Sequence, residues 1–213
     1  MAKVLVIGAS KGIGLETVKQ ALEAGHQVRA LARSAGRIPV NHPELEKVAG
    51  DALDRATVEK ALDGIDVVIQ TLGVSGGPGI LLKPIRLFSD ATRVLVAAME
   101  AKLVNRLICV TGLGAGNSRG KGGFLYNAFI GLILVRVYDD KTIQERIIRN
   151  STLDWVIVRP GGLTNGAHTG RYKVLTDPRD WRGGFISRAN VADFLVKQID
   201  SDAHLHQTPV LIG

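Results

Sequence analysis

Short apolar runs alternate with amphipathic stretches along the chain. Each apolar run is four to six residues long and rich in Val, Ile or Leu, as buried strands of a parallel sheet are. The strands that this pattern predicts are Val4–Ile7, Gln27–Ala32, Leu45–Val48, Asp66–Gln70, Arg106–Val110, Trp155–Val158 and Pro209–Ile212.

The stretches between these runs have the apolar spacing and the end signals of helices. Asp54 and Ser187 stand where N-caps belong, and Gly25 and Gly64 stand where helices stop. The predicted helices are Gly12–Ala24, one from Asp54 to just before Gly64, Pro84–Ala101, a long helical region that follows the loop Gly112–Gly123 and ends near Asn150, and Arg188–Ile199. Apolar strands separated by helices predict an α/β fold of Rossmann type, a doubly wound parallel sheet with helices on both faces.

The organisation of the chain indicates one domain, because 213 residues contain neither an internal repeat nor a linker. We expect residues 1–213 to form this domain, with the substrate region built from about 112–186. The first strand begins at Lys3 and leads into a glycine turn rather than a cleavage site, so we expect no leader and a cytoplasmic location. Cys109 is the single cysteine and has apolar neighbours, which predicts a buried thiol in a reducing compartment.

The formal net charge of +7 indicates an anionic partner. The Lys and Arg residues are dispersed and lack aromatic interleaving, so we expect a small anion rather than nucleic acid. The apolar stretch 124–137 is interrupted by Asn127 and Arg136 and is too short for a membrane span. We interpret it as a core helix, with a pocket wall or a dimer surface as alternatives, so the protein is expected to be a monomer or a homodimer. His204 and His206 lack further ligands, and no metal site is expected.

A glycine-rich turn joins the first strand to the first helix. In Gly8-x-x-x-Gly12-x-Gly14, the first glycine permits a tight turn, the second a close approach of the backbone to a pyrophosphate, and the third close packing of helix and sheet. The helix N-terminus adds N–H groups and a positive dipole end. We therefore predict a dinucleotide site that includes Gly8, Ser10, Lys11, Gly12, Ile13 and Gly14.

The end of the second strand indicates which dinucleotide is bound. An NAD site usually has an acidic residue there, whereas this chain reads Ala32-Arg33-Ser34. Arg33 is suited to a 2′-phosphate, and Lys11 can reach the same group from the turn. This favours NADP(H) over NAD(H), against the alternative that both cations are solvated surface residues.

Further cofactor contacts are expected at the carboxyl ends of the other strands. Asp51 is placed to accept from the adenine amino group, with a helix N-cap as its alternative role. The expected contacts are Asp51 and Ala52 at the adenine, Thr71, Leu72 and Gly73 along the ribose, and Thr111 and Gly112 near the nicotinamide.

The chain resembles the short-chain dehydrogenase/reductase superfamily, in its atypical NAD(P)H-binding branch with the flavin-reductase-like and NmrA-like proteins. The glycine turn, Gly50-Asp51-Ala52-Leu53, Asp140-Lys141 and the run from Trp155 to Gly161 carry this resemblance. It implies an oxidoreductase that moves a hydride between the nicotinamide and a small acceptor. It also implies that Pro160, Gly161, Gly162 and Leu163 wrap the nicotinamide end, with Pro fixing the chain and the glycines permitting close approach.

The catalytic residues depart from the family pattern. Relatives use Tyr-x-x-x-Lys, whereas this chain has Tyr138 three residues before Lys141 and Val137 at the tyrosine position. Tyr138 is a candidate proton donor or a packing residue. Lys141 is a candidate ribose ligand or the partner of Glu145. Thr111 is the nearest hydroxyl for a substrate carbonyl or a cap of the next loop, and Ser118 is a further candidate.

Two functions remain open at this point. An acceptor such as a flavin or a quinone can take its proton from solvent, so an irregular tyrosine favours an NADPH-dependent reductase of a flavin-, quinone- or carbonyl-type acceptor, the first two above all. The alternative is a non-catalytic NADP(H)-sensing regulator of NmrA-like type.

Overall fold

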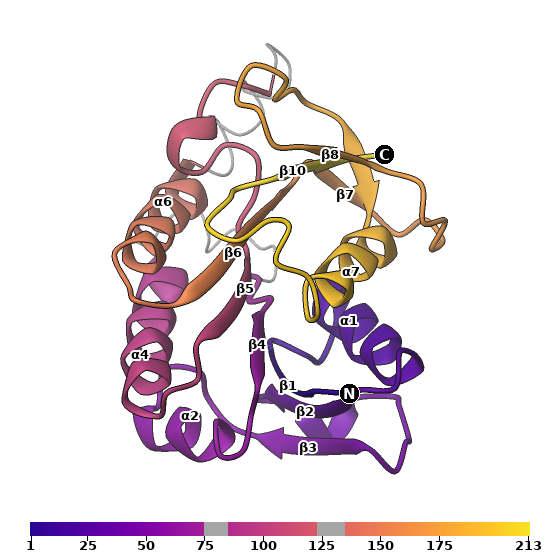
Figure 1. Ribbon diagram of the computed structural model, residues 1–213, viewed down its shortest axis with the longest axis vertical. Helices are drawn as coiled ribbons and strands as arrows, with labels where there is room; N and C mark the ends of the chain where they lie inside the picture. The colour runs from indigo at the N-terminus through magenta and orange to yellow at the C-terminus, as the bar shows by residue number, and fades with distance from the viewer. Residues whose placement is uncertain (75–84, 123–134) are drawn as a thin grey trace.

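The computed structural model describes residues 1–74, 85–122 and 135–213. The strands within these ranges are β1 Lys3–Ile7, β2 Gln27–Ala32, β3 Leu45–Ala49, β4 Val67–Gln70, β5 Arg106–Val110, β6 Asp154–Pro160, β7 Gly162–Thr164, β8 Lys173–Leu175, β9 Phe185–Ser187 and β10 Val210–Ile212. Across this described part, eight strands form one sheet in the order β3-β2-β1-β4-β5-β6-β10-β8 (Figure 1). All pairings are parallel except that of β8 with β10, and β7 and β9 form a separate parallel pair.

Helices cover both faces of this sheet, as the apolar pattern predicts. They are α1 Gly12–Glu23, α2 Arg55–Ala61, α4 Leu87–Ala101, α6 Val135–Arg149 and α7 Arg188–Lys197, with short 3-10 turns η1 Ala35–Arg37 and η2 Gly116–Ser118. α1 and α7 lie on one face, and α2, α4 and α6 lie on the other (Figure 1). Alternate β1 residues face the two cores, Val4 with Val18 and Phe194, and Leu5 on the opposite side with Leu95. The doubly wound Rossmann-type fold is thus confirmed.

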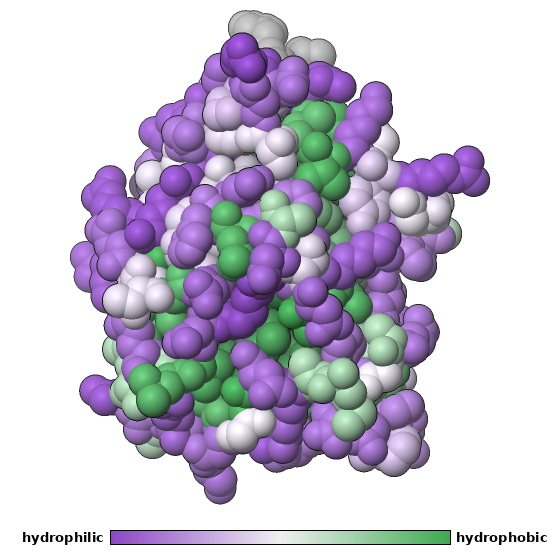
Figure 2. All heavy atoms as spheres, viewed as in Figure 1, coloured by the Kyte–Doolittle hydropathy of each residue, from purple (hydrophilic) through white to green (hydrophobic). Residues whose placement is uncertain are grey.

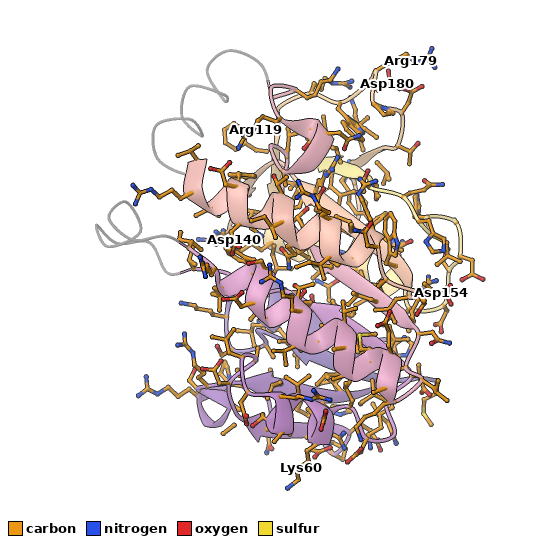
Figure 3. All side chains as sticks on the ribbon, turned by 90° about the vertical axis from the view of Figure 1, so that its left-hand side faces the viewer. Lys60, Arg119, Asp140, Asp154, Arg179 and Asp180 are labelled. Atoms are coloured by element: carbon orange, nitrogen blue, oxygen red, sulfur yellow. The ribbon has the colours of Figure 1, made fainter. Side chains whose placement is uncertain are left out.

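The reversal of strand order fixes where a ligand site lies. β2 and β3 follow β1 on one side, and β4, β5 and β6 lie on the other. In open α/β sheets, ligands bind outside the carboxyl ends of the strands at such a reversal. Asp154, which begins β6, lies toward the right of Figure 3, and Asp140, near the start of α6, lies toward the left. The carboxyl ends of the strands therefore face the Asp140 side.

The ends of most elements follow their sequence signals. The Asp54 carboxylate accepts from Thr57 N at 3.1 Å, and the Ser187 hydroxyl accepts from Asn190 N at 3.1 Å, so both predicted N-caps are confirmed. Gly25 follows α1 with φ +83°, a left-handed conformation that glycine adopts without strain. α7 ends at Lys197, two residues before the predicted Ile199. The predicted helix start at Pro84 and most of the apolar stretch 124–137 lie outside the described residues.

Three strands have no counterpart in the sequence prediction. β7, β8 and β9 contain three residues each and lack the buried apolar run of the central strands. β8 pairs with β10 at the edge of the main sheet, whereas β7, which follows β6, pairs with β9, which precedes α7. Nothing in the local pattern indicates that pairing.

Most of the visible surface in Figure 2 is hydrophilic, with apolar side chains between the polar ones over the middle of the molecule. No helix in the ranges 1–74, 85–122 and 135–213 is long and apolar enough to cross a membrane. Over the same ranges, no three His, Cys, Asp or Glu side chains gather as metal ligands do. His204 instead hydrogen-bonds Gln198 Oε1 at 2.9 Å, and the His206 ring meets the edge of Trp155. Cys109 is fully buried, as predicted, and burial raises the pKa of its thiol to about 12.

Candidate functional site

The glycine turn is shaped by its packing against the end of β4. Gly8 has φ +88°, and a Cβ there would lie 3.0 Å from the Thr71 backbone. A Cβ on Gly14 would lie 2.3 Å from the Gly8 carbonyl oxygen and 2.5 Å from Thr71 Oγ1. Both positions exclude any side chain. Close packing of helix and strand, the role expected of Gly14, is therefore present in the structure.

Gly12, by contrast, leaves room for a Cβ and has one side chain nearby. Its φ is +60°, and the nearest described atoms to a Cβ there are Arg188 Cδ and Nε at 3.8 Å. The helix that begins at Gly12 has no acidic residue in its first turn, so its positive dipole end is not neutralised locally. Ser10, Lys11 and Ile13 are each at least partly exposed around this point. A backbone cradle next to an uncompensated helix end fits a pyrophosphate.

Two arginines follow β2 at the end where an adenosine ribose is expected. Arg33 directly follows β2, and Arg37 ends the short turn η1; both are exposed. Neither is in an ion pair with a carboxylate of the described chain. Sequence reasoning named Arg33 and missed Arg37, although the spacing Arg33-x-x-x-Arg37 was visible. The hydrogen-bond donors beyond β2 are therefore two cationic guanidinium groups, which are suited to a 2′-phosphate.

Asp51 lies beyond β3 with an exposed carboxylate. Its Oδ1 accepts from Leu53 N at 3.0 Å, which closes a turn, while the helix N-cap is Asp54. Ala52 is buried with the α2 and α4 side of the core. The alternative role of Asp51 as a helix cap is thus not the one found. Its adenine contact stays a prediction.

The Thr71 side chain is used within the fold. Its hydroxyl donates to the Ile7 carbonyl oxygen at 2.9 Å and is buried, so it ties the end of β4 to the end of β1. Leu72 is partly exposed and Gly73 is exposed beside it. A ribose contact in this segment would therefore come from its backbone rather than from the Thr71 hydroxyl.

Lys141 extends from α6 to the carboxyl end of β5. Its side chain is 8% exposed, its Nζ donates to the Val110 carbonyl oxygen at 3.3 Å, and it lies 4.2 Å from the centre of the Phe88 ring. Burial lowers the pKa of Lys141 to about 8. Glu145 pairs with Arg159 rather than with Lys141. The alternative of a Lys141–Glu145 ion pair is therefore wrong.

Tyr138 also reaches the end of β5. A Cβ on Gly112 would lie 2.9 Å from the Tyr138 hydroxyl oxygen, so the phenol rests directly on this glycine. Val137, at the family's tyrosine position, is 5% exposed. A tyrosine shifted by one residue thus still brings its hydroxyl close to the strand end that Lys141 reaches. The position of Tyr138 is compatible with both of its expected roles, packing and proton donation.

Thr111 belongs to a buried network that sequence reasoning missed. Its hydroxyl donates to Glu145 Oε1 at 2.8 Å. The same carboxylate accepts from Arg159 Nε at 2.9 Å and Nη2 at 2.5 Å, and Arg159 also donates to Asn117 Oδ1 at 2.8 Å. The Thr111 hydroxyl therefore points inward. The hydroxyl therefore neither faces a substrate nor caps the next loop. Its hydrogen-bond acceptor, Glu145, could not be inferred from sequence spacing.

Ser118 has a structural role within the loop after β5. Its hydroxyl accepts from Gly114 N at 2.9 Å and donates to the Ala115 carbonyl oxygen at 2.7 Å, with no exposed surface. Both hydrogen bonds of the Ser118 hydroxyl thus stabilise the loop, and Ser118 is not a catalytic candidate.

The segment Pro160–Leu163 leaves β6 at its carboxyl end. Gly161 is buried, and a Cβ there would lie 2.4 Å from the Gly184 carbonyl oxygen. A Cβ on Gly162 would lie 2.7 Å from the Phe185 ring. Phe185 is 70% exposed and Leu163 is 38% exposed. In the β7–β9 pair, Phe185 lies opposite Gly162 and Leu163 lies opposite Ile186, so the two exposed apolar side chains are on different faces. The exposed ring of Phe185 therefore accompanies the segment expected to wrap a nicotinamide, and the sequence prediction did not include it.

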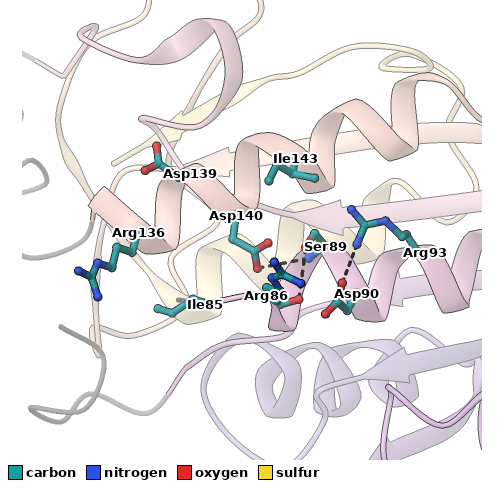
Figure 4. Close-up of a pocket in the computed structure, with 9 residues that line it drawn as sticks. All are labelled: Ile85, Arg86, Ser89, Asp90, Arg93, Arg136, Asp139, Asp140 and Ile143. Carbon is teal, nitrogen blue, oxygen red and sulfur yellow. Dashed lines mark hydrogen bonds and ion pairs between the residues drawn. The ribbon is translucent and has the colours of Figure 1, made fainter. Parts of the chain in front are cut away.

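A groove of about 560 Å³ lies away from these residues, between the N-terminal parts of α4 and α6 (Figure 4). Asp140 lines it and accepts from Phe88 N at 2.8 Å and Ser89 N at 3.3 Å. None of the predicted cofactor residues lines this groove. Asp140, from the Asp140-Lys141 motif, is therefore a cap of α4 supplied by α6.

Comparison with known proteins identifies relatives of the whole chain. The NAD(P)H-binding family model matches residues 8–202. ChuY from Escherichia coli O157:H7, described as an anaerobillin reductase, superimposes with a TM-score of 0.80 at 28% identity over 99% of this chain and 96% of that one. The sugar epimerase YhfK of Bacillus subtilis, itself uncharacterised, is 27% identical over 93% of this chain and 88% of its own length.

A longer relative comes from plants. The chloroplastic protein TIC 62 of Arabidopsis thaliana is 31% identical over 90% of this chain, which spans 32% of the length of TIC 62. The cytoplasmic location expected for the present chain stays a prediction. The fold, the glycine cradle and the family match agree: the chain belongs to the NAD(P)H-binding family, in the atypical branch of the short-chain dehydrogenases/reductases.

Proposed function

We propose that the protein is an NADPH-dependent reductase that delivers hydride to a small, planar, apolar acceptor of flavin or quinone type. One observation carries the proposal: Lys141 and Tyr138 of α6 both reach the carboxyl end of β5, which is where the nicotinamide end of a dinucleotide lies in this fold class. Bound NADPH supplies the hydride. The buried amine of Lys141 is suited to hold the adjacent ribose, and the Gly8–Gly14 turn is suited to hold the pyrophosphate.

The preference for NADPH rests on the cations beyond β2. Arg33 and Arg37 are exposed at the expected position of a 2′-phosphate, and the segment between them contains no carboxylate. A charge-assisted bond to that phosphate is worth about 1.5–3 kcal/mol, or about 10- to 150-fold in affinity. We expect Arg33→Ala to weaken NADPH binding by this amount and to leave NADH binding unchanged.

The class of acceptor is supported by the apolar surface beside Gly162. Phe185 is 70% exposed and its ring lies against Gly162, and the anaerobillin reductase ChuY shares the fold at 28% identity. An exposed aromatic ring is suited to stack on a conjugated acceptor, an interaction worth about 0.5–1.5 kcal/mol. We expect Phe185→Ala to raise KM for such an acceptor about 2- to 10-fold, with NADPH affinity unchanged. Leu103→Ala, which removes another exposed apolar side chain, is the matched control.

The test is NADPH oxidation with a panel of flavins, quinones and aldehydes, with NADH in parallel. We expect turnover with a flavin or a quinone that survives Tyr138→Phe, because such an acceptor takes its proton from solvent. Turnover of aldehydes alone, lost in Tyr138→Phe, would replace the proposed acceptor class by carbonyl compounds.

A second candidate is a non-catalytic sensor of NADP(H). Its supporting observation is Val137, a side chain without chemistry at the family's tyrosine position. Tight NADPH binding without oxidation by any acceptor in the panel would favour this function over the reductase.

A further inference from the structure

A side chain from the C-terminal part of the sequence lies next to the turn around Gly12. Arg188 is the first residue of α7, and its Cδ and Nε lie 3.8 Å from the position of a Cβ on Gly12. Nothing in the sequence motif of the turn indicates this neighbour, because 176 residues separate the two positions. We propose that Arg188 binds the pyrophosphate of the dinucleotide and closes the cradle that Gly8–Gly14 forms on the other side. This inference rests on the proposed binding of a dinucleotide at the turn.

The position of Arg188 is fixed by the packing of α7 against α1. The Ser187 hydroxyl caps the helix, so Arg188 is held in its first turn. Gln20 of α1 donates to the Ala189 carbonyl oxygen at 2.9 Å, and the two helices share the core around Val18 and Phe194. The backbone that carries the guanidinium is therefore as rigid as the turn that it faces.

The guanidinium is oriented by one neutral partner. Arg188 Nη1 donates to Asn165 Oδ1 at 2.7 Å, and within the described chain no carboxylate forms an ion pair with Arg188. A bidentate contact with phosphate uses two parallel N–H groups of the guanidinium. Nε, the nitrogen nearest Gly12, belongs to the Nε–Nη2 edge, which the bond to Asn165 leaves available. Position, charge and donor geometry thus agree on a phosphate ligand.

The arrangement assigns different parts of the cofactor to different arginines. Arg33 faces the 2′-phosphate, which NADH lacks, whereas Arg188 faces the pyrophosphate, which both dinucleotides contain. Asn165 directly follows β7, which continues the segment Pro160–Leu163. Through its hydrogen bond to Asn165, Arg188 is therefore connected to the segment that is expected to lie at the nicotinamide.

The experiment measures equilibrium binding of NADPH, NADH and adenosine 2′-monophosphate to the full chain by calorimetry, independently of turnover. We expect Arg188→Gln to weaken both dinucleotides at least about tenfold and to leave adenosine 2′-monophosphate unchanged, since that probe has no pyrophosphate. Arg33→Ala should show the opposite pattern, with NADPH and adenosine 2′-monophosphate weakened and NADH unchanged. Arg179→Gln, which removes an exposed charge outside the cleft, should match the wild type for all three.

A second variant keeps the test valid if Arg188→Gln does not fold. Asn165→Asp keeps Arg188 and supplies it with a carboxylate, which should weaken both dinucleotides in the same way. Unchanged dinucleotide affinity in both variants would overturn the assignment of Arg188 while leaving the proposed function intact. A wild-type protein that binds neither dinucleotide would overturn both proposals.

Discussion

The buried pair of Glu145 and Arg159 provides the sharpest test of the energetics around the site. Arg159 has no exposed surface and Glu145 is 2% exposed. The carboxylate accepts from Arg159 Nε, Arg159 Nη2 and the Thr111 hydroxyl, and Arg159 Nη1 has no hydrogen-bond partner among the described residues. Glu145→Gln keeps the shape and removes the charge. It leaves an uncompensated guanidinium in the interior.

The expected loss follows from the burial of both partners. Breaking a fully buried ion pair by removing one charge costs about 3–5 kcal/mol. A chain of this size loses about 2–4 °C of Tm per kcal/mol, so Tm should fall by roughly 6–20 °C. The measurement is the free energy of unfolding from urea denaturation, with thermal unfolding followed by circular dichroism.

A double variant separates the lost charge from lost packing. Glu145→Leu combined with Arg159→Met removes both charges, so it should destabilise the fold less than Glu145→Gln alone. A loss below about 1 kcal/mol for Glu145→Gln would show that Glu145 is not what compensates the charge of Arg159, because water or another group would then already do so.

Two further predictions concern the turn and the buried lysine. Gly14→Ala should destabilise the fold by about 1–3 kcal/mol, because its Cβ would lie 2.3 Å from the Gly8 carbonyl oxygen. Gly36→Ala is the control, since a Cβ there would have no described atom within 4 Å. Equal denaturation midpoints for the two variants would mean that Gly14 is not tightly packed. Burial lowers the pKa of Lys141 from 10.5 to about 8, so between these values the unfolded chain binds more protons and stability should rise with pH. Below pH 8 Lys141 is charged in both the folded and the unfolded chain, so the destabilisation caused by burying the charge should be complete. The measurement is the free energy of unfolding of wild type and Lys141→Met from pH 7 to 10. If the difference between the two proteins does not change over this range, the amine is better solvated than its burial indicates.

The sequence predicted the layers of the fold because its central strands are continuous apolar runs. Val4–Ile7 and Arg106–Val110 are buried on both faces, which leaves a pattern that survives without tertiary information. β7 and β9 escaped prediction because their pairing depends on a backbone route set by Gly161 and Gly184, whose contact excludes a side chain.

The candidate site was predictable only where it is local in sequence. The Gly8–Gly14 turn and Arg33 follow strands directly, so the strand prediction located them. Arg188 and Glu145 act across the fold, on the turn and on Thr111 respectively, and no spacing rule relates them. The direction of a hydroxyl is also a tertiary property, which is why Thr111 was a candidate from the sequence although its hydroxyl points inward in the structure.

The proposed function requires that the residues at the carboxyl ends of β1 and β5 bind NADPH and bring its hydride to a planar acceptor. The most direct test is loss of NADPH absorbance with a flavin or a quinone as acceptor, compared between wild type, Arg33→Ala and an NADH control. We expect the wild type to oxidise NADPH faster than NADH at low cofactor concentration, and Arg33→Ala to remove this difference. Equal rates with both cofactors in the wild type, or no oxidation of either, would exclude the proposed NADPH-dependent reductase.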